Sequence, residues 1–373
     1  MTNGCRLCGS TWLRTVLDLG KVPAADWFPA ADTPIAPDEA AHELRMVRCG
    51  ACGLAQLADD DTVTQEPRGV EPQALREQAA AAVRQVSGLL TGGTVREFGS
   101  PHGGTWLPLL TGRGYVETRG AADLVLDSFG IMHRPDQGAA ILERAAATAP
   151  DGVLLLQFHS LAAIVALNQW NALRHGHFAY YSLAALRELL ADAGMSAATA
   201  WTFPLYGGTT LVAARHGTHP PDAAISAILA VEEPMTSAPA VARLQFGADR
   251  HIRALRERLT LAAERGQRVY AYGAASRAVA VFSRAGLHRG LIAAVADASP
   301  AKQGRRMPGT DIPIVAPAEL LAAAPDLVLL TLPDLLAEVR ERYPELDGRW
   351  LLDEPAVLDG SDGTPPDPVR VEE

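Results

Sequence analysis

Residues 170–182, WNALRHGHFAYYS, place two histidines, an arginine and two tyrosines around one glycine. Imidazole exchanges protons near neutral pH, and a guanidinium can bind an anionic or enolate oxygen. We therefore expect acid-base chemistry at a catalytic group made of Arg174, His175, His177 and Tyr181. The alternative is that Ser182 only caps the following helix and that the aromatic side chains pack in a core. Two more histidines, His102 and His159, lie near the ends of predicted strands.

All four cysteines of the chain fall in two CxxC pairs, in CRLCGS and CGACGL. Each pair can direct two thiolates at one centre, and two pairs complete the tetrahedral shell of a structural zinc ion. We predict a closed zinc site made of Cys5, Cys8, Cys49 and Cys52. Two disulfides are the alternative, which a reducing cytoplasm disfavours.

Two glycine-rich turns follow predicted strands, in VREFGSPHGGTW and in RVYAYGAASRAVAV. A strand, a glycine turn and a helix in this order let the backbone approach a nucleotide-like ligand at the start of the helix. In the second turn Arg277 follows Gly273 and could hold a phosphate beside the first helical amides. Either turn can also form without a ligand, and Arg277 could be an ordinary solvated helix residue.

The composition excludes several classes of partner. The chain has 373 residues, a net charge of −10 and 48% hydrophobic residues. A binder of nucleic acid or of anionic membranes would carry a basic surplus. The chain lacks an uncharged apolar run of about 20 residues, and its first residues lack the pattern of a signal peptide. We expect a cytoplasmic protein that acts on a small molecule, with no nucleic-acid polymer and no membrane as partner.

Short apolar runs alternate with amphipathic stretches along most of the chain, for example ADLVLDSF, QGAAILERAAATAP and GVLLLQF. This alternation predicts strands and helices of a parallel α/β sheet. We interpret the charged, proline-broken residues 59–72 as a linker. Residues 216–245 interrupt the pattern again, and a long helix over about 243–264 leads into a second α/β series. The expected parts are residues 1–75, 76–215 and 216–373, the last ending in an acidic tail.

The ordered motifs CRLCGS, CGACGLAQL, GHFAYYS, YGAASRA and ADASPAKQGRRMPGTDIPI resemble one family. They are similar to zinc-containing, SAM-dependent C-methyltransferases that act on nucleotide-linked keto-sugars in natural-product pathways. The resemblance implies a zinc-binding lobe, a Rossmann-like methyltransferase domain and a C-terminal Rossmann-like domain, with substrate between them. It implies SAM contacts from Glu97, Gly99, Gly103, Gly104 and Glu117. It implies substrate contacts from Tyr206, Gly207, Gly208, Tyr272, Gly273, Arg277 and Lys302.

The central segment departs from that family. Relatives have a segment like YHEHFSYFS, in which a tyrosine, a glutamate and a histidine remove the proton next to a ketone. Here the tyrosine is replaced by Arg174 and the glutamate by Gly176, so a base survives without its acidic partner. The tyrosine that such relatives carry after the second CxxC pair is also missing from TVTQEPRGVEP.

The part of the chain expected to form the methyltransferase domain is also shorter than the SAM fold requires. Only residues 105–122 separate the glycine turn from the strand that begins at Asp123, whereas a strand-helix-strand unit needs roughly 30 residues. We expect at least one strand and one helix of the SAM fold to be absent, and SAM affinity to be reduced or lost. The sequence therefore predicts a tailoring enzyme of the sugar C-methyltransferase type. The alternatives are a non-methylating acid-base enzyme (an isomerase, lyase or cyclase) and a catalytically silent binding subunit.

Overall fold

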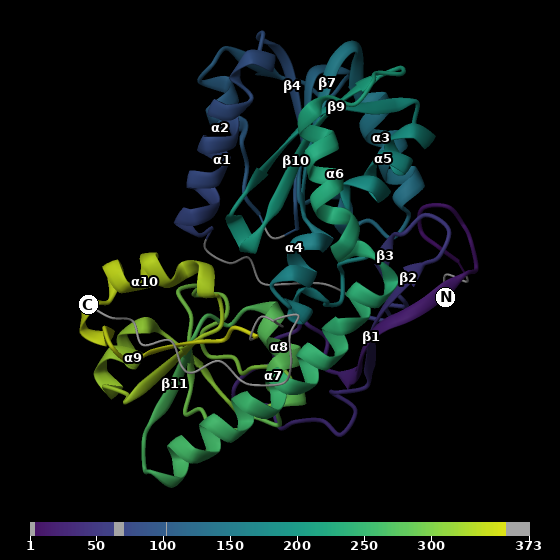
Figure 1. Ribbon diagram of the computed structural model, residues 1–373. Coiled ribbons are helices and arrows are strands. Elements are labelled where there is room, and N and C mark those ends of the chain that lie inside the picture. The colour runs from purple at the N-terminus through teal and green to yellow at the C-terminus, as the bar shows by residue number, and fades with distance from the viewer. Residues whose placement is uncertain (1–3, 63–70, 102, 356–373) are drawn as a thin grey trace.

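The computed structural model describes residues 4–62, 71–101 and 103–355, and within them the chain forms three sheets (Figure 1). In Figure 1 the middle sheet lies at the top, the C-terminal sheet at the lower left and the N-terminal sheet at the lower right. The predicted α/β class is confirmed.

The N-terminal sheet joins two distant parts of the chain. Its order is β1 (Leu13–Val22), β2 (His42–Cys49), β3 (Ala55–Leu57) and β8 (Ala179–Tyr180), all antiparallel. β8 belongs to the segment that carries the predicted catalytic residues, and the amide of Leu57 donates to the carbonyl of Phe178 at 3.3 Å. The N-terminal lobe therefore holds that segment in place.

The middle sheet has the order β5-β4-β6-β7-β10-β9. Its strands are β4 (Gly93–Phe98), β5 (Tyr115–Glu117), β6 (Ala122–Ser128), β7 (Thr148–His159), β9 (Met195–Phe203) and β10 (Thr209–His216). The first four strands in the sheet order are parallel, and β10 runs antiparallel to both β7 and β9.

Helices cover both faces of this sheet. Leu124 and Leu126 pack toward α1 (Gln73–Gln85) and α2 (Leu107–Thr111). Val125, between them, packs on the opposite side with α3 (Gln137–Ala147), α5 (Leu183–Asp192) and α6 (Ala223–Thr236). Successive side chains of a strand point to opposite faces, so Leu124, Val125 and Leu126 are all apolar because both faces of the sheet are buried there.

The predicted shortening of the middle sheet is confirmed. Residues 105–122 contain only the short helix α2 and the three-residue strand β5. β5 is the edge strand, and within the described residues no strand lies beyond it. The sheet is therefore one parallel strand short on the side where the family is expected to bind the adenine of SAM.

The C-terminal sheet is parallel throughout, in the order β13-β12-β11-β14-β15. Its strands are β11 (Val269–Tyr272), β12 (Val295–Ala296), β13 (Ile314–Val315), β14 (Leu327–Leu330) and β15 (Trp350–Leu352). Its helices are α8 (Ser276–Arg284), α9 (Pro317–Ala323) and α10 (Leu336–Arg342). The glycine turn that begins at Gly273 connects β11 to α8, as predicted.

Two consecutive helices connect the middle and C-terminal domains. α6 packs on α4 (Leu161–Ala166), α5 and β9 of the middle domain, although the predicted boundary at residue 216 assigns it to the C-terminal domain. α7 (Ala238–Glu264) contains the predicted long helix and packs on β1 and β11 (Figure 1). α6 therefore packs with the middle domain, and α7 reaches both the N-terminal and the C-terminal sheets.

A buried ion pair fastens the N-terminal lobe to the C-terminal domain. The Arg306 guanidinium donates to both carboxylate oxygens of Glu39, at 2.6 and 2.7 Å, and both side chains are almost fully buried. Arg306 also donates to the carbonyls of Thr33, Pro34 and Thr310. Because every charged group has partners, the desolvation cost of this pair is offset.

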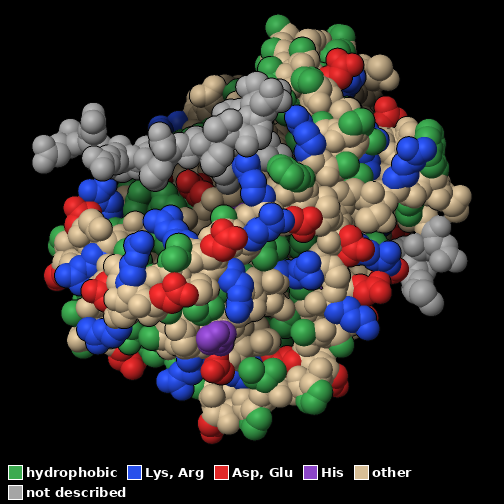
Figure 2. Space-filling model, turned by 60° about the horizontal axis from the view of Figure 1, so that its bottom comes forward, with side chains coloured by type: hydrophobic (Ala, Val, Ile, Leu, Met, Phe, Trp, Pro, Cys, Tyr) green, Lys and Arg blue, Asp and Glu red, His purple; other side chains and the backbone are tan. Residues whose placement is uncertain are grey.

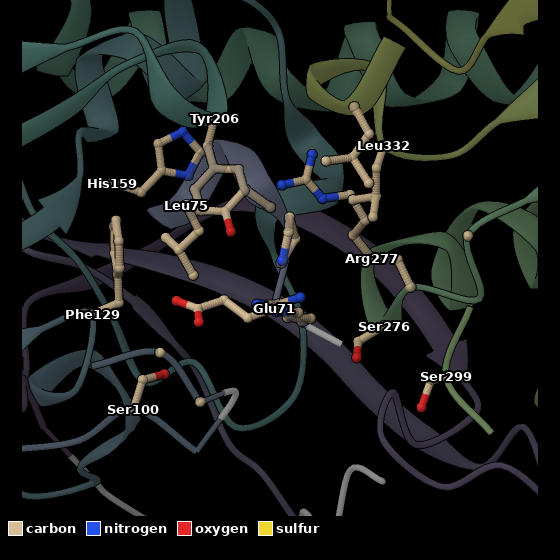
Figure 3. Close-up of a pocket in the computed structure, with 18 of the residues that line it drawn as sticks. Glu71, Leu75, Ser100, Phe129, His159, Tyr206, Ser276, Arg277, Ser299 and Leu332 are labelled. Atoms are coloured by element: carbon tan, nitrogen blue, oxygen red, sulfur yellow. The ribbon is translucent and has the colours of Figure 1, made fainter. Parts of the chain in front are cut away.

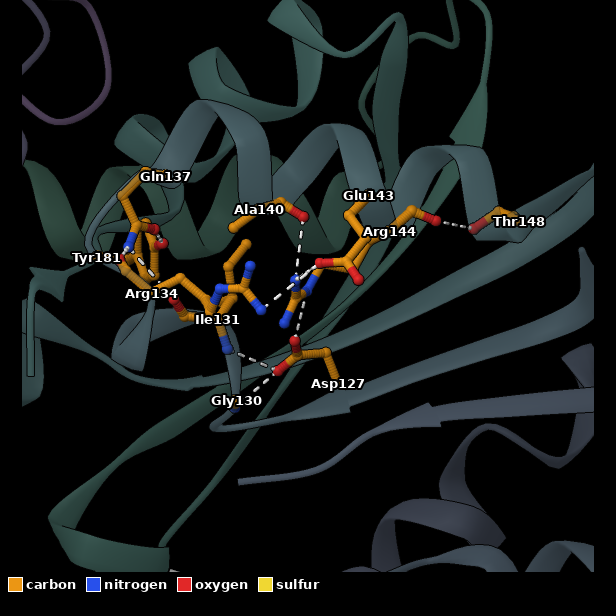
Figure 4. A network of polar contacts seen from close by, with 10 residues as sticks. All are labelled: Asp127, Gly130, Ile131, Arg134, Gln137, Ala140, Glu143, Arg144, Thr148 and Tyr181. Atoms are coloured by element: carbon orange, nitrogen blue, oxygen red, sulfur yellow. Dashed lines mark hydrogen bonds and ion pairs between the residues drawn. The ribbon is translucent and has the colours of Figure 1, made fainter. Parts of the chain in front are cut away.

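A second buried ion pair organises the end of β6 (Figure 4). The Asp127 carboxylate accepts from Arg144 Nε at 2.7 Å and from the amides of Gly130 and Ile131 at 2.7 and 3.0 Å. These amides begin the turn that leads to His133, which faces the cavity described below. The ion pair therefore fixes a turn next to that cavity.

Replacing this carboxylate should destabilise the fold strongly. Asp127→Asn leaves the Arg144 guanidinium buried without its counter-charge, which typically costs about 3–5 kcal/mol. Urea unfolding followed by circular dichroism would measure the change. Asp347→Asn, which removes the exposed partner of Arg340, is the control and should cost less than about 1 kcal/mol. Equal losses in the two variants would contradict this assignment.

The surface carries charges of both signs. Figure 2 shows Lys and Arg interspersed with Asp and Glu over one face, without a large area of one sign. That face lacks the basic surplus with which proteins meet a phosphate backbone. Among the described residues no helix is both long and apolar enough to cross a bilayer.

Candidate functional site

A cavity of about 270 Å³ lies between the middle and C-terminal domains. Its lining includes Ser100, Phe129 and His159, which follow or end β4, β6 and β7. From the other domain it includes Gly273, Ser299 and Leu332, which follow β11, β12 and β14. Ligands of parallel sheets bind outside the carboxyl ends of the strands, and here two such ends face one another (Figure 3).

Arg174 and His177 meet in this cavity, as the sequence predicted for a shared site. Arg174 Nε donates to His177 Nε2 at 2.8 Å, and both residues line the cavity. Because Nε2 accepts this bond, the ring hydrogen of a neutral His177 is on Nδ1. His177 is therefore a hydrogen-bond donor at Nδ1. The sequence alone did not show whether it would act as an acid or as a base.

His175 and Tyr181 lie elsewhere. His175 is buried against the N-terminal lobe, with Nε2 3.3 Å from the carbonyl oxygen of Glu43, and burial lowers its pKa. Gly176, between the two histidines, has φ +78°, and this turn sends their rings in different directions. Tyr181 donates to Gln137 inside the middle domain (Figure 4). The expected catalytic group is thus divided, and Tyr180 faces the cavity where Tyr181 was predicted.

Two aromatic residues in the left-handed region of backbone space line the cavity. Phe129 has φ +59° and Tyr206 has φ +55°, and their rings pack edge to face with centroids 5.9 Å apart. A bulky residue with this φ is unfavourable, and such strain concentrates at functional sites. The Tyr206 ring also lies under the Arg277 guanidinium, 5.6 Å from its central carbon.

The other predicted substrate residues divide into two groups. Tyr272, Gly273, Arg277 and Lys302 line the cavity, whereas Gly207 and Gly208 do not. A Cβ on Gly207 would lie 2.4 Å from a Leu167 methyl, and one on Gly208 would lie 2.5 Å from the Ala163 Cβ. These two glycines permit close packing on α4 and the chain that follows it.

Arg277 provides the positive charge of the C-terminal wall. It lies in the first turn of α8, and within the described residues its guanidinium has no hydrogen bond or ion pair. Burial lowers the pKa of Arg277, and the nearby Arg174 guanidinium lowers it further. Two guanidiniums near one cavity and a helix N-terminus favour an anionic ligand.

His159 is an unprotonated imidazole at the end of β7. Its Nε2 is buried without a hydrogen-bond partner among the described residues. Burial, and next the charge of Arg277, lowers its pKa to about 3. Protonated His159 would place a third positive charge beside the two arginines, so the neutral form is favoured. His102, the other histidine near a predicted strand end, lies outside the described residues.

The lowered pKa of His159 predicts that the folded protein loses stability as the pH falls. The folded pKa is lowered from 6.5 to about 3, so below pH 6.5 the unfolded chain binds a proton that the folded chain does not. His159 therefore contributes stability above pH 6.5 that is lost as pH falls toward 3, by up to about 1.4 kcal/mol per pH unit. Urea unfolding at several pH values should show a smaller decline in His159→Gln than in the wild type. Parallel curves for the two proteins would refute this shift.

Of the residues predicted to contact SAM, only the two glycines at the end of the turn line the cavity. Gly103 and Gly104 line the cavity with φ +88° and +85°, whereas Gly99 does not line it. The Glu97 carboxylate accepts from the amide of Trp106 at 2.8 Å and from the Thr105 hydroxyl, and burial raises its pKa. Glu117 is exposed on the edge strand. Within the described residues no strand follows β5 at this edge of the sheet.

The four cysteines are gathered in the N-terminal lobe as predicted. Their Sγ atoms lie within 4.8 Å of one another, with Cys5 to Cys52 at 3.5 Å and Cys8 to Cys49 at 3.6 Å. A tetrahedral zinc ion with bonds of about 2.3 Å sets its sulfurs about 3.8 Å apart. The amides of Leu7 and Ala51 point at the sulfurs of Cys5 and Cys49. This donor set fits zinc.

His133 and Glu71 line the cavity and were not predicted from the sequence. His133 follows β6, and its Nδ1 lies 2.9 Å from the carbonyl oxygen of Gly176, so Nδ1 carries the hydrogen. Its ring packs edge to face on His177 at 4.4 Å. Glu71 comes from residues 59–72, which we interpreted only as a linker. The one signal for Glu71 was a carboxylate just before a predicted helix.

Family models match both ends of the chain. A model for a zinc binding domain matches residues 5–65, and a model described as "C-methyltransferase C-terminal domain" matches residues 204–353. The C-methyltransferase NovU of Streptomyces niveus is 28% identical and matches 95% of this chain and 96% of its own.

Solved methyltransferase structures match part of the chain. The magnesium protoporphyrin IX methyltransferase of Synechocystis PCC 6803 is 16% identical and covers 40% of this chain and 90% of its own, with a TM-score of 0.28. A SAM-dependent methyltransferase of Thermotoga maritima is 12% identical and covers 38% of this chain and 90% of its own, with a TM-score of 0.29.

Proposed function

We propose that this chain converts a keto substrate to its enolate in the cavity between its two α/β domains and methylates the activated carbon. The matches to a zinc-binding domain, to a C-methyltransferase C-terminal domain and to the C-methyltransferase NovU support this proposal. The observation that carries this proposal is the pair of guanidiniums, Arg174 and Arg277, at a cavity shared by both domains.

The substrate we propose is a nucleotide-linked keto-sugar. Arg277 and the start of α8 are suited to a phosphate, and Ser276 and Ser299 add hydroxyl groups to the same wall. The sugar would then reach toward the middle domain, where Arg174, His177 and Tyr180 line the cavity. In such a ligand the diphosphate is bonded to the sugar, so one molecule would contact both groups of residues.

Arg174 and His177 would stabilise the oxygen that becomes negative. Removal of the proton next to the ketone leaves the charge on the keto oxygen, and donors placed there lower the barrier. In the arrangement described, His177 donates from Nδ1, while Arg174 brings a permanent charge. SAM, when bound at the glycine turn after β4, would supply the electrophilic methyl group.

We propose zinc as the metal of the four cysteines, with a structural role. Four thiolates fill a tetrahedral shell and leave no position for substrate. The site lies in the N-terminal lobe, and none of its cysteines lines the cavity.

Methyl transfer is tested by product analysis. The zinc-loaded protein would be incubated with SAM and a nucleoside diphosphate-linked keto-deoxyhexose, and the products analysed by mass spectrometry. We expect a product heavier by one methyl group, together with S-adenosylhomocysteine. No methylated product, and no calorimetric binding of SAM at millimolar concentration, would contradict methyl transfer.

A second candidate is acid-base chemistry without methylation, an isomerisation or elimination of the same substrate. The missing strand beyond β5 favours it, because adenine has no wall there within the described residues. In that case the keto-sugar would be converted, or its hydrogen exchanged, at the same rate with and without SAM.

A further inference from the structure

Three carboxylates of the described residues line the cavity: Glu71, Asp297 and Glu338. Asp297 accepts from the amides of Ala274 and Ser299, both at 2.7 Å. Glu338 accepts from the amide of Gln73 at 3.0 Å and so caps the start of α1. The Glu71 carboxylate has no hydrogen bond or ion pair within the described residues. It is therefore the carboxylate of this cavity that is left to act on a ligand.

Figure 3 shows Glu71 extending into the cavity, below the Tyr206 hydroxyl and beside Leu75. One carboxylate oxygen lies 3.2 Å from the position that a Cβ on Gly104 would take, so a side chain there would displace it. The carbonyl of Glu71 accepts from Arg76 at 2.9 Å, and α1 begins two residues later. The backbone thus holds this side chain between the glycine turn and the strained Tyr206.

The histidines that line the cavity are poorly suited to take a proton from carbon. His177 Nε2 already accepts from Arg174, and His133, which donates from Nδ1, has its basic nitrogen Nε2 buried. Neutral His159 is a weak base. The segment 174–181 contributes no carboxylate of its own. A carboxylate, in contrast, is an acceptor in its ionised form and a common general base.

We infer that Glu71 is the general base that removes the proton from the carbon next to the ketone. The C–H bond breaks, the proton passes to a carboxylate oxygen of Glu71, and the electron pair forms the C=C bond of the enolate. The negative charge moves to the keto oxygen, beside Arg174 and His177. This inference rests on the proposed function, because it names the base for the enolisation proposed there.

The test compares Glu71→Gln with Glu77→Gln, an exposed glutamate of α1, the helix that follows Glu71. Both variants would be incubated in D2O with a nucleoside diphosphate-linked keto-deoxyhexose, and loss of the hydrogen next to the ketone followed by NMR. We expect exchange to slow by about 100-fold or more in Glu71→Gln, with unchanged binding of the sugar nucleotide by calorimetry. Glu77→Gln should exchange at the wild-type rate.

Wild-type exchange in Glu71→Gln would overturn the inference and leave the proposed function standing. Absence of exchange in the wild-type protein would overturn both. If Glu71→Gln does not fold, Glu71→Asp replaces it: a shortened base should retain part of the exchange and shift its pH profile. Wild-type exchange and an unchanged profile in Glu71→Asp would also count against Glu71 as the base.

Discussion

Removal of the metal from the four-cysteine site is expected to unfold the N-terminal sheet. Cys49 is fully buried at the end of β2, and both CxxC turns depend on a common centre. Binding of a structural zinc ion contributes on the order of 10 kcal/mol to folding. Cys49→Ser, or a strong chelator, should therefore lower the melting temperature and release one equivalent of zinc. Ser10→Ala, next to the first turn, is the control.

The same change should abolish turnover, although the cysteines do not line the cavity. β8 pairs with β3, and the amide of Gly176 donates to Asp60 of the N-terminal lobe at 2.7 Å. Loss of the lobe would release the segment that carries Arg174 and His177. A metal-free protein that melts at the same temperature and keeps its activity would contradict the structural role of zinc.

The two neighbouring histidines are expected to differ strongly when replaced. His177 lines the cavity and pairs with Arg174, so His177→Gln should lower kcat by about 100-fold through lost stabilisation of the enolate oxygen. His175 faces the N-terminal lobe, so His175→Gln should leave kcat near the wild-type value and lower the melting temperature. Steady-state kinetics and thermal unfolding of both variants make the comparison.

Each variant serves as the control for the other, because only Gly176 separates the two histidines in the sequence. A similar loss of kcat in both would mean that the segment acts as a unit and that their different positions are irrelevant. A normal kcat in His177→Gln would remove His177 from the site.

The sequence predicted those features that depend on local pattern. The cysteine spacing predicted the four-sulfur cluster, because a CxxC turn brings its own two thiolates together. The alternation of apolar runs predicted the two α/β domains, and the short interval 105–122 predicted the absent strand. These predictions hold because chain length and periodicity restrict what a segment can form.

Features that depend on tertiary contacts could not be predicted in this way. A single left-handed residue, Gly176, separates the directions of His175 and His177, and neither residue type indicates which faces the substrate. The strand β8 is too short for a pattern to show that Tyr180 faces the cavity and Tyr181 the core. Glu71 reaches the site only because α1 packs against the glycine turn, a contact between segments about 30 residues apart.

The most direct test of enolisation between the domains is hydrogen exchange in the wild-type protein without SAM. A nucleoside diphosphate-linked keto-deoxyhexose is incubated with the zinc-loaded protein in D2O, and deuterium is located by NMR. We predict deuterium at the carbon next to the ketone, at a rate that falls at least tenfold in Arg277→Gln when the substrate is below saturation. No enzyme-dependent deuterium at that carbon, at saturating protein and substrate, would contradict enolisation in this cavity.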